Sequence, residues 1–255
     1  MINDLLIIAA GMGSRLKARG DLKPLVEVGG VSLIEHAIGA AMAAGLSRVT
    51  VVTGHKATKL ERFLEALAAR RGWHIQTVHN TDFRKPNGLS VLCARQLMKG
   101  RFCLAMCDHL VTPSLYRRLL AAEPRPGQVA LAVDRRLDNP CVDLSDVTRV
   151  QLAGRQIRDI GKEIAIHNAF DTGVFAADPA LFKALEDSGY KTGDFSLSGG
   201  IRHLAANKRA IGVDIGDAFW IDVDSPEMHA LATEWLATSG RATAPRSTGH
   251  PVSAP

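Results

Sequence analysis

The chain opens with a short apolar run that leads directly into a glycine turn, and this junction constrains the fold more than any other segment. The run Leu5–Ala10 has the length of a strand buried in a parallel sheet. Gly11 and Gly13 let the backbone turn sharply and approach a ligand without a Cβ in the way. Successive N–H groups in such a turn attract phosphate oxygens. The junction therefore suits the triphosphate of a nucleotide.

Polar side chains beside the turn also suit phosphate binding, although two familiar phosphate-binding sequence patterns are missing. Ser14 adds a hydroxyl donor, and Arg15 and Lys23 add positive charge. The dinucleotide pattern G-x-G-x-x-G would need a glycine where Leu16 stands. The P-loop pattern, with Gly-Lys-Ser/Thr at its end, is absent as well.

The longer string Ala9–Leu16, followed by Lys23–Leu25, resembles the signature of the nucleotidyltransferase superfamily. These enzymes join a nucleoside triphosphate to a phosphorylated small molecule, such as a sugar phosphate or a polyol phosphate. Ser14 stands where the signature usually has Thr, and it keeps the hydroxyl. The resemblance spans roughly residues 4–238 and implies an α/β fold. That fold is a Rossmann-like three-layer sandwich with a mostly parallel mixed sheet.

Composition narrows the function classes. The 255 residues suit one large α/β domain, and a formal charge of +5 favours small anionic substrates. The sequence has no Lys/Arg run or basic aromatic stripe, so we expect no nucleic-acid partner. Four cysteines without C-x-x-C or zinc spacing indicate reduced thiols and a cytoplasmic protein. No basic leader and no apolar stretch long enough for a membrane segment are present.

Strand and helix patterns alternate up to Asp134, which predicts a parallel sheet with helices on both faces. We expect strands at 5–10, 49–53, 75–79, 102–106 and 129–133, and helices at 32–45, 56–71, 89–98 and 113–122. Ser32 and Glu35 form a capping-box pair at the first helix.

Beyond Asp134 the pattern begins with a hairpin. We expect strands at 147–152, 156–160, 169–176, 211–215 and 219–223, and helices at 179–188, 197–207 and 226–238. Residues 1–238 are predicted to form a single domain, with a nucleotide-binding part (1–134) and an acceptor-binding part (135–238). The Ser-, Thr-, Ala- and Pro-rich residues 239–255 are predicted to be a disordered tail.

Three aspartates are candidate metal ligands. Asp108 follows a buried strand, where α/β sheets bind ligands, although a capping or turn role is an alternative. Asp222 and Asp224 would point to the same side of a late strand and repel each other unless a cation compensates. Asp224 can instead cap the helix that begins near residue 226, a role that Ser225 can also fill. Which of Asp222 and Asp224 is the second ligand stays open.

The resemblance becomes narrower at four further segments. Nucleotidyltransferases have one aspartate after a central strand and a second in a late strand, which together hold Mg²⁺. The segments Lys85–Val91, Met106–His109, Gly161–Glu163 and Asn168–Phe175 look like those of inositol-1-phosphate cytidylyltransferases. The resemblance implies a Mg²⁺-dependent enzyme that transfers CMP from CTP to inositol 1-phosphate and releases pyrophosphate.

The resemblance also implies roles for individual residues. Arg15 would hold the β- and γ-phosphates, and Lys23 would act on the α-phosphate or the acceptor phosphate. Nucleotide-binding residues are expected at Ala9, Ala10, Gly11, Gly13, Ser14, Gly54, Asn87, Gly88 and Ser90. Acceptor contacts are expected from His109, Lys162, Asp171 and Thr172. Asn87 and Ser90 can equally serve as a turn residue and a helix cap, and Asp171 as a strand-end turn residue.

Alternatives remain at this point. Within the superfamily, UTP or GTP can be the donor, and phosphocholine, an aminoalkylphosphonate or a hexose 1-phosphate the acceptor. A nucleotide-binding regulatory protein without turnover is an alternative of another class. The joint presence of Arg15, Lys23, Asp108 and Asp222 argues against that class, because sensing needs no metal bridge. The expected partners are thus CTP and a phosphorylated alcohol, and a homo-oligomer is possible.

Overall fold

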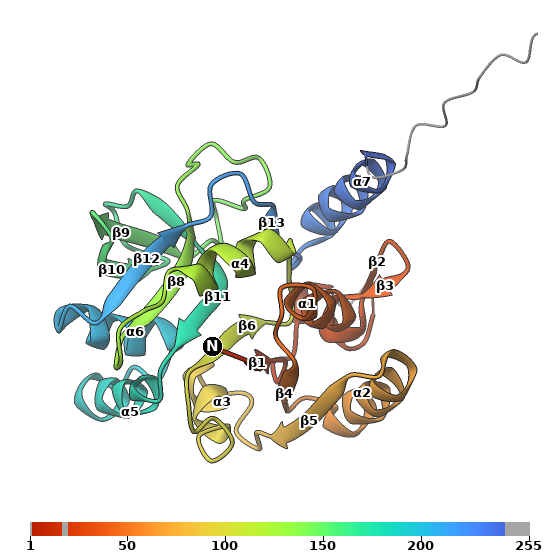
Figure 1. The fold of residues 1–255 in the computed structure, drawn as a ribbon, viewed down its shortest axis with the longest axis horizontal. Coiled ribbons are helices and arrows are strands. Elements are labelled where there is room, and N and C mark those ends of the chain that lie inside the picture. The colour runs from red at the N-terminus through yellow and green to blue at the C-terminus, as the bar shows by residue number, and fades with distance from the viewer. Residues whose placement is uncertain (1, 17–19, 243–255) are drawn as a thin grey trace, which may run out of the picture.

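The computed structural model describes residues 2–16 and 20–242 and has one large mixed β-sheet with helices on both faces (Figure 1). The strands of the sheet are β1 (Asp4–Ile8), β4 (Arg48–Thr53), β5 (His74–His79), β6 (Phe102–Met106), β8 (Val129–Asp134), β9 (Arg149–Ala153), β10 (Gln156–Gly161), β11 (Ala169–Ala177) and β12 (Ala210–Asp214). The helices are α1 (Leu33–Met42), α2 (Ala57–Arg71), α3 (Gly88–Cys93), α4 (Pro113–Ala121), α5 (Ala180–Thr192), α6 (Leu197–Ala206) and α7 (Pro226–Ala242). None of the helices described is long and apolar enough to cross a membrane.

The strand order is β5-β4-β1-β6-β11-β8-β12-β10-β9, and this arrangement confirms the expected α/β fold class. The first four strands are parallel, as are β8 and β12. β11 runs antiparallel between β6 and β8, which corrects the expected continuous parallel order up to β8. The alternation of strands and helices along the chain could not reveal this, because β11 comes later in the sequence than both its neighbours. A sheet built this way brings the two predicted parts of the chain into one layer.

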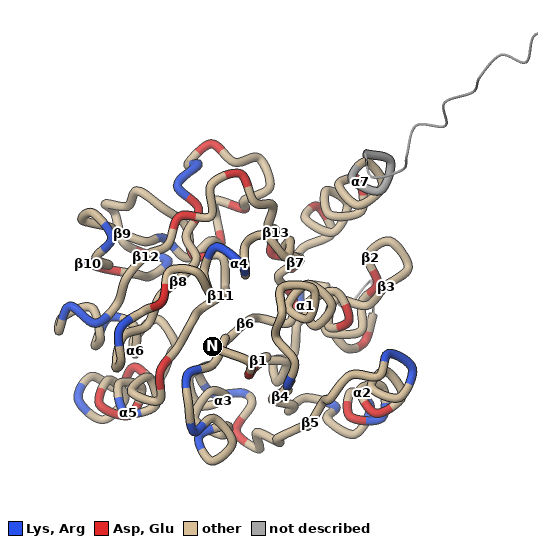
Figure 2. Tube along the Cα trace, viewed as in Figure 1, with Lys and Arg blue, Asp and Glu red and all other residues tan. Residues whose placement is uncertain are grey.

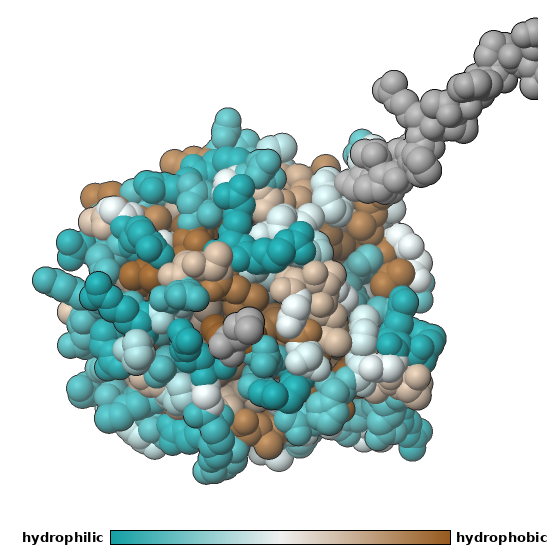
Figure 3. Space-filling model, in the orientation of Figure 1, coloured by the Kyte–Doolittle hydropathy of each residue, from teal (hydrophilic) through white to brown (hydrophobic). Residues whose placement is uncertain are grey.

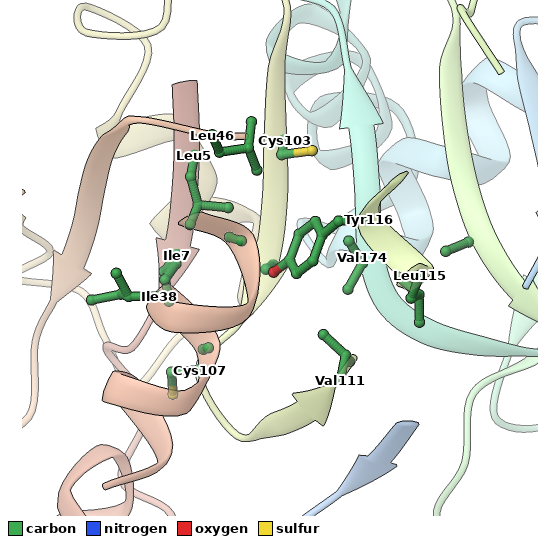
Figure 4. Packing of buried hydrophobic residues seen from close by; sticks show 14 of the residues in the cluster. Leu5, Ile7, Ile38, Leu46, Cys103, Cys107, Val111, Leu115, Tyr116 and Val174 are labelled. Atoms are coloured by element: carbon green, nitrogen blue, oxygen red, sulfur yellow. The ribbon is translucent and has the colours of Figure 1, made fainter. Parts of the chain in front are cut away.

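Alternating residues of the strands face two separate cores, as the period of two in a strand requires. Leu5 and Ile7 of β1 face the core under α1, α2 and α4, part of which Figure 4 shows. Leu6 and Ile8 face the opposite core under α3, α5 and α6. Charged residues lie mainly on the outer helices and loops (Figure 2), and the visible surface is largely hydrophilic (Figure 3). The cores therefore fix β1 and β6 rigidly, and their carboxyl ends carry the site.

A third, smaller core lies at one end of the sheet and was not expected from the sequence. It packs the two short hairpin strands β2 (Glu27–Val28) and β3 (Val31–Ser32) against α7 and a second pair, β7 (His109–Val111) and β13 (Trp220–Asp222). β7 and β13 are antiparallel and form a separate two-stranded sheet. β13 lies within the strand expected at 219–223, whereas β2, β3 and β7 were not expected, because strands of two or three residues carry little periodicity.

The start of α1 and the end of α7 differ in detail from what the sequence predicted. Ser32 caps α1, since its Oγ accepts the Glu35 N–H at 3.3 Å. The Glu35 carboxylate does not complete the capping box, because Arg70 and Arg71 of α2 bind it instead. α7 continues to Ala242, beyond the helix end expected at residue 238, and residues 243–255 of the predicted tail lie outside the described residues. The single-domain interpretation stays a prediction.

Candidate active site

The glycine turn of residues 11–13, which we call the phosphate turn, follows the carboxyl end of β1 and packs on Lys23. Gly13 has a positive φ of 57°, which favours glycine, and a Cβ there would collide with the Lys23 side chain. Ser14 begins the short 3₁₀ helix η1 (Ser14–Leu16), and Lys23 begins a second one, η2 (Lys23–Leu25). Gly11 is exposed at the tip of the turn. The turn and its lysine therefore form one unit that faces a pocket.

The β7–β13 pair brings together two aspartates that are distant in sequence. Asp108 follows β6 and directly precedes β7, and Asp222 ends β13 opposite His109. The backbone N–H of Val223 donates to the Asp108 carbonyl at 2.9 Å and closes the junction. The two carboxylates therefore face the same end of the cleft, as expected for a shared ligand.

Lys23 lies between these carboxylates. Its Nζ is 2.5 Å from Asp108 Oδ2 and 3.8 Å from Asp222 Oδ1. Burial works to lower the pKa of Lys23, but the charges of Asp108 and Asp222 raise it well above its usual range. Burial likewise works to raise the pKa of Asp108, and the charge of Lys23 outweighs it, so that the pKa is lowered. Lys23 is thus a permanent cation at the centre of the site.

His109 is held in one orientation beside Asp222. Its Nδ1 lies 2.7 Å from the Thr172 carbonyl, and its Nε2 lies 3.4 Å from Asp222 Oδ2. The ring covers Gly173, where φ is 75° and a Cβ would collide with it. Burial works to lower the pKa of His109, but Asp222 and Asp108 raise it to about 10. The imidazole is therefore a second positioned cation.

Asp146 was missed by the sequence analysis, and it joins both sides of the cleft. Its carboxylate is 2.7 Å from an Arg15 nitrogen and 2.5 Å from Lys162 Nζ. Burial alone would raise the pKa of Asp146, but the hydrogen bonds from Arg15 and Lys162 lower it to about 2. The same Arg15 nitrogen lies 2.7 Å from Asp224. Asp146 lies in an irregular loop, where no periodic pattern marks it.

The aspartates are suited to hold a metal ion. Two groups have ligand atoms within 4.8 Å of one another: Asp108, His109 and Asp222, and Asp146, Asp222 and Asp224. Among the described residues, Asp222 Oδ1 and Asp224 Oδ1 are buried without a hydrogen-bond partner, while Asp224 Oδ2 has only the Arg15 ion pair beside it. Such orphaned oxygens fit a hard divalent cation. Ser225 Oγ accepts the Met228 N–H at 3.2 Å, so Ser225 caps α7.

Two adjacent pockets share Asn87, Met106, Asp108 and Asp224. The first, which we call the nucleotide pocket, contains the phosphate turn and is lined further by Ile8, Gly11, Gly13, Arg15, Lys23, Pro24, Phe83, Lys85, Ser90 and Cys107. The second, which we call the acceptor pocket, is lined further by His109, Cys141, Val142, Asp143, Asp146, Val147, Thr148, Lys162, Asp171, Gly173, Phe175, Leu197, Ser198, Trp220 and Asp222. Asp108 therefore stands between two compartments that open into each other.

Thr172 requires a correction. Its side chain is fully buried, and its Oγ1 donates to the Ala132 carbonyl at 2.9 Å, so it cannot contact an acceptor. Neighbouring residues on a strand point to opposite faces, so Asp171 and Thr172 could not both face the pocket. Asp171 lines the acceptor pocket, and burial raises its pKa to about 6.

Two predicted glycine contacts also require correction. A Cβ at Gly54 would lie 2.6 Å from Phe83 Cβ and 2.8 Å from Ala10 Cβ, and one at Gly88 would collide with the Phe195 carbonyl. Both glycines therefore serve close packing of the chain, and neither lines the two pockets. Ala9 and Ala10 are buried behind the turn, and their backbones bond to Val52 and His55.

Asn87 and Ser90 line the nucleotide pocket, but their side chains also have structural partners. Asn87 Oδ1 accepts the Leu197 N–H at 2.8 Å and ties α3 to α6, without capping α3. Ser90 Oγ accepts from Asn80 Nδ2 at 2.9 Å. Lys85 and Trp220 belong to the pocket walls but were not singled out from the sequence. Lys85 follows Phe83 in the same turn, and this Lys-Pro-Asn segment was the available signal.

Comparison with known proteins shows the family and the fold of this chain. Residues 5–165 match the family model described as MobA-like NTP transferase domain. The chain is 34% identical over 234 residues to the "Bifunctional IPC transferase and DIPP synthase" of Rubrobacter xylanophilus, covering 90% of this chain and 51% of that protein. It is 30% identical over 244 residues to the "CMP-5'-(3-aminopropyl)phosphonate synthase" of Streptomyces rubellomurinus, covering 87% of this chain and 37% of that protein. The chain thus spans about half or less of these relatives.

Among solved structures, the inositol-1-phosphate CTP transferase from T. maritima superposes with a TM-score of 0.78 at 24% identity. The superposition covers 91% of this chain and 96% of the other, and it establishes the shared fold. The family match covers the phosphate turn, Lys23, Asp108, Asp146 and Lys162. The chain belongs to the family of MobA-like NTP transferase domains.

Proposed function

We propose that this chain transfers CMP from CTP to inositol 1-phosphate, giving the CDP-alcohol and pyrophosphate. One observation carries the proposal: two pockets meet at Asp108, one with a phosphate turn and Lys23, the other with Lys162. The names of the Rubrobacter relative and of the T. maritima structure support the choice of substrates. We keep a cytoplasmic location and a homo-oligomeric state as predictions.

The residues of the cleft suit a transfer between two anions. The acceptor phosphate would attack the α-phosphate in line, and pyrophosphate would leave toward Arg15 and the turn around Gly13. Lys23 neutralises charge between the reacting groups, and Lys162 would hold the acceptor phosphate. Because a phosphate nucleophile is already ionised near neutral pH, no general base is needed. The protein therefore acts by alignment and charge neutralisation.

Asp108 and Asp222 would hold Mg²⁺, with Asp224 close to Asp222. The ion would supply charge neutralisation between the two substrates. In the structure, Lys23 compensates Asp108 and Arg15 compensates Asp224. Lys23 contacts Asp108 through Oδ2 alone and would also be close to phosphate oxygens in the cleft.

The direct test is pyrophosphate release with each of CTP, UTP and GTP against inositol 1-phosphate, glucose 1-phosphate, phosphocholine and 3-aminopropylphosphonate. We expect CTP with inositol 1-phosphate to give the highest kcat/KM. An acceptor used more than about tenfold better, a difference of ~1.4 kcal/mol in transition-state binding, would contradict the assignment. Binding of nucleotide without release from any pair would favour the regulatory alternative.

A second acceptor class is supported by the carboxylates of the acceptor pocket. Asp143, Asp146 and Asp171 lie on its walls in addition to the three candidate metal ligands. Carboxylates accept hydrogen bonds from polyol hydroxyls, but they can also bind an ammonium group. The similarity to the Streptomyces aminopropylphosphonate synthase makes an aminoalkylphosphonate the second candidate. The acceptor panel distinguishes the two.

A further inference from the structure

A buried carboxylate that lies outside both pockets connects the walls of the acceptor pocket. Asp134, the last residue of β8, is fully buried and accepts five hydrogen bonds. Its Oδ1 accepts from the Arg136 backbone N–H at 2.9 Å and from Arg136 Nε at 2.8 Å. Its Oδ2 accepts from an Arg136 terminal nitrogen at 3.0 Å, Asn139 Nδ2 at 2.8 Å and Trp220 Nε1 at 2.8 Å.

These bonds join two segments that are far apart in sequence. Arg136 and Asn139 belong to the loop of residues 135–148 that connects β8 to β9, and Trp220 begins β13. Arg136 also donates to the Ala218 carbonyl at 3.0 Å, and Asn139 Oδ1 accepts the Cys141 N–H at 3.0 Å. The loop and the start of β13 are thus both held by one carboxylate.

Both segments supply walls of the acceptor pocket. The loop contributes Cys141, Val142, Asp143, Asp146, Val147 and Thr148, and β13 contributes Trp220 and Asp222. The Trp220 ring stacks near His109, with centroids 6.1 Å apart. The residues of the nucleotide pocket, in contrast, come mainly from the ends of β1 and β6 and from residues 83–90.

We propose that Asp134 is a positioning residue for the acceptor, which fixes the 135–148 loop and β13 relative to each other without touching substrate. The inference rests on the proposed function, because it assigns this pocket to the acceptor. Removing Asp134 would loosen one substrate site and leave the other in place. A general loss of folding would affect both equally.

The test compares Asp134→Asn with the wild-type protein. An asparagine presents its NH₂ group to N–H donors in either orientation of the amide, so the network cannot re-form. We expect faster hydrogen–deuterium exchange in peptides that cover 135–148 and 218–222. We also expect KM for inositol 1-phosphate to rise about fivefold or more, while KM for CTP stays within about twofold.

Two further variants keep the test decisive. Arg136→Met removes two of the five bonds from a side chain that is 39% exposed, and should give the same pattern with a smaller amplitude even if Asp134→Asn fails to fold. In this variant Asp134 still accepts hydrogen bonds from the backbone N–H of residue 136, from Asn139 and from Trp220. Glu35→Gln is the matched control, because Glu35 is also a buried carboxylate paired with arginines but lies outside both pockets.

The outcomes separate the inference from the proposed function. Unchanged or uniformly faster exchange in the Asp134 and Arg136 variants, or an equal rise of both KM values, overturns the positioning role. The same exchange pattern in Glu35→Gln would also overturn it. If the wild-type protein releases no pyrophosphate with any acceptor of the panel, the proposed function fails, and the exchange pattern alone decides whether Asp134 orders the two segments.

Discussion

At the scale of single residues, the two cations expected to bind phosphate differ in their surroundings. The Lys23 side chain is 12% exposed and lies between Asp108 and Asp222. The Arg15 side chain is 53% exposed and reaches across the cleft to Asp146 and Asp224. Removing Lys23 would leave two facing carboxylates uncompensated and disturb folding as well as turnover. Arg15 is therefore the better probe of phosphate binding.

We expect Arg15→Ala to lower kcat/KM by about 100-fold, since it removes a charged donor from the departing pyrophosphate. The Arg15 side chain is exposed but its partner Asp224 is buried, so we expect the free energy of unfolding to fall by about 1–3 kcal/mol, which leaves the protein folded. The control is Arg48→Ala, which removes an equally exposed arginine paired with Asp4 outside the pockets. Steady-state kinetics and urea unfolding of both variants check the prediction. Equal losses of folded protein and activity would mean that Arg15 has a structural role.

At the scale of elements, close contacts of helices with neighbouring segments explain the residue type at two positions, Glu35 and Gly88. Glu35 of α1 is buried and binds Arg70 and Arg71 of α2, so the residue that appeared to complete a helix cap instead joins two helices. Gly88 begins α3 where the chain around Phe195 approaches too closely for a side chain. Both positions act through packing, and each makes a testable claim about stability.

Glu35→Gln should destabilise the protein in a pH-dependent way. Burial works to raise the pKa of Glu35, but the hydrogen bonds from Arg71 and Arg70 lower it below its ordinary value of 4.5. The folded state therefore binds this proton less readily than the unfolded state. The stability advantage of the wild type, about 1–3 kcal/mol, is full at neutral pH and is lost as the pH falls through the folded pKa.

Urea unfolding of both proteins at neutral pH and below pH 4 measures this difference. The exposed Glu65 of α2 provides the control, because Glu65→Gln should leave the free energy of unfolding nearly unchanged at both pH values. A difference between wild type and Glu35→Gln that is independent of pH would contradict the charge-based explanation.

Gly88→Ala should destabilise the protein by about 1–3 kcal/mol, because the new methyl group collides with a backbone carbonyl that cannot move freely. The matched variant is Gly100→Ala, since a Cβ at Gly100 meets no atom within 4 Å. Thermal unfolding of the two variants distinguishes them. Wild-type stability together with weaker CTP binding in Gly88→Ala would contradict the packing role and support the predicted contact between Gly88 and the nucleotide.

At the scale of the whole molecule, the site exists only because distant segments meet. β1 supplies the phosphate turn, β6 leads to Asp108, β13 carries Asp222, and the 135–148 loop supplies Asp146. Each alone is an ordinary strand end or loop. Together they place a cluster of carboxylates and cations around one cleft.

We expect turnover to require a divalent cation and Asp108→Ala to lower it by at least about 100-fold, because several kcal/mol of transition-state stabilisation would be lost. Turnover is measured with Mg²⁺ and with excess EDTA. Asp4→Asn, at the opposite end of β1, is the control and should keep wild-type turnover. Undiminished turnover in the chelator would exclude a metal at this site.

The sequence alone determined the elements whose signals are local. The apolar run of β1, the strand β6 and the glycine turn could be recognised because burial and backbone geometry impose residue types directly on a short segment. The α/β class followed from the alternation of such segments. Arg15 and Lys23 could be named because they lie beside the glycine turn, and Asp108 and Asp222 because carboxylates at strand ends suit a metal ion. The structure places all four around the two adjoining pockets.

Only the tertiary structure decided how these segments combine. The insertion of β11 between β6 and β8, and the pairing of β7 with β13, depend on contacts between segments separated by dozens of residues. Asp146 acquires its partners Arg15 and Lys162 through such contacts alone. The inward direction of Thr172 and the packing role of Gly88 likewise depend on neighbours distant in sequence. Local patterns constrain each backbone segment, whereas side-chain partners across a fold are set by packing, which leaves no periodic trace in the sequence.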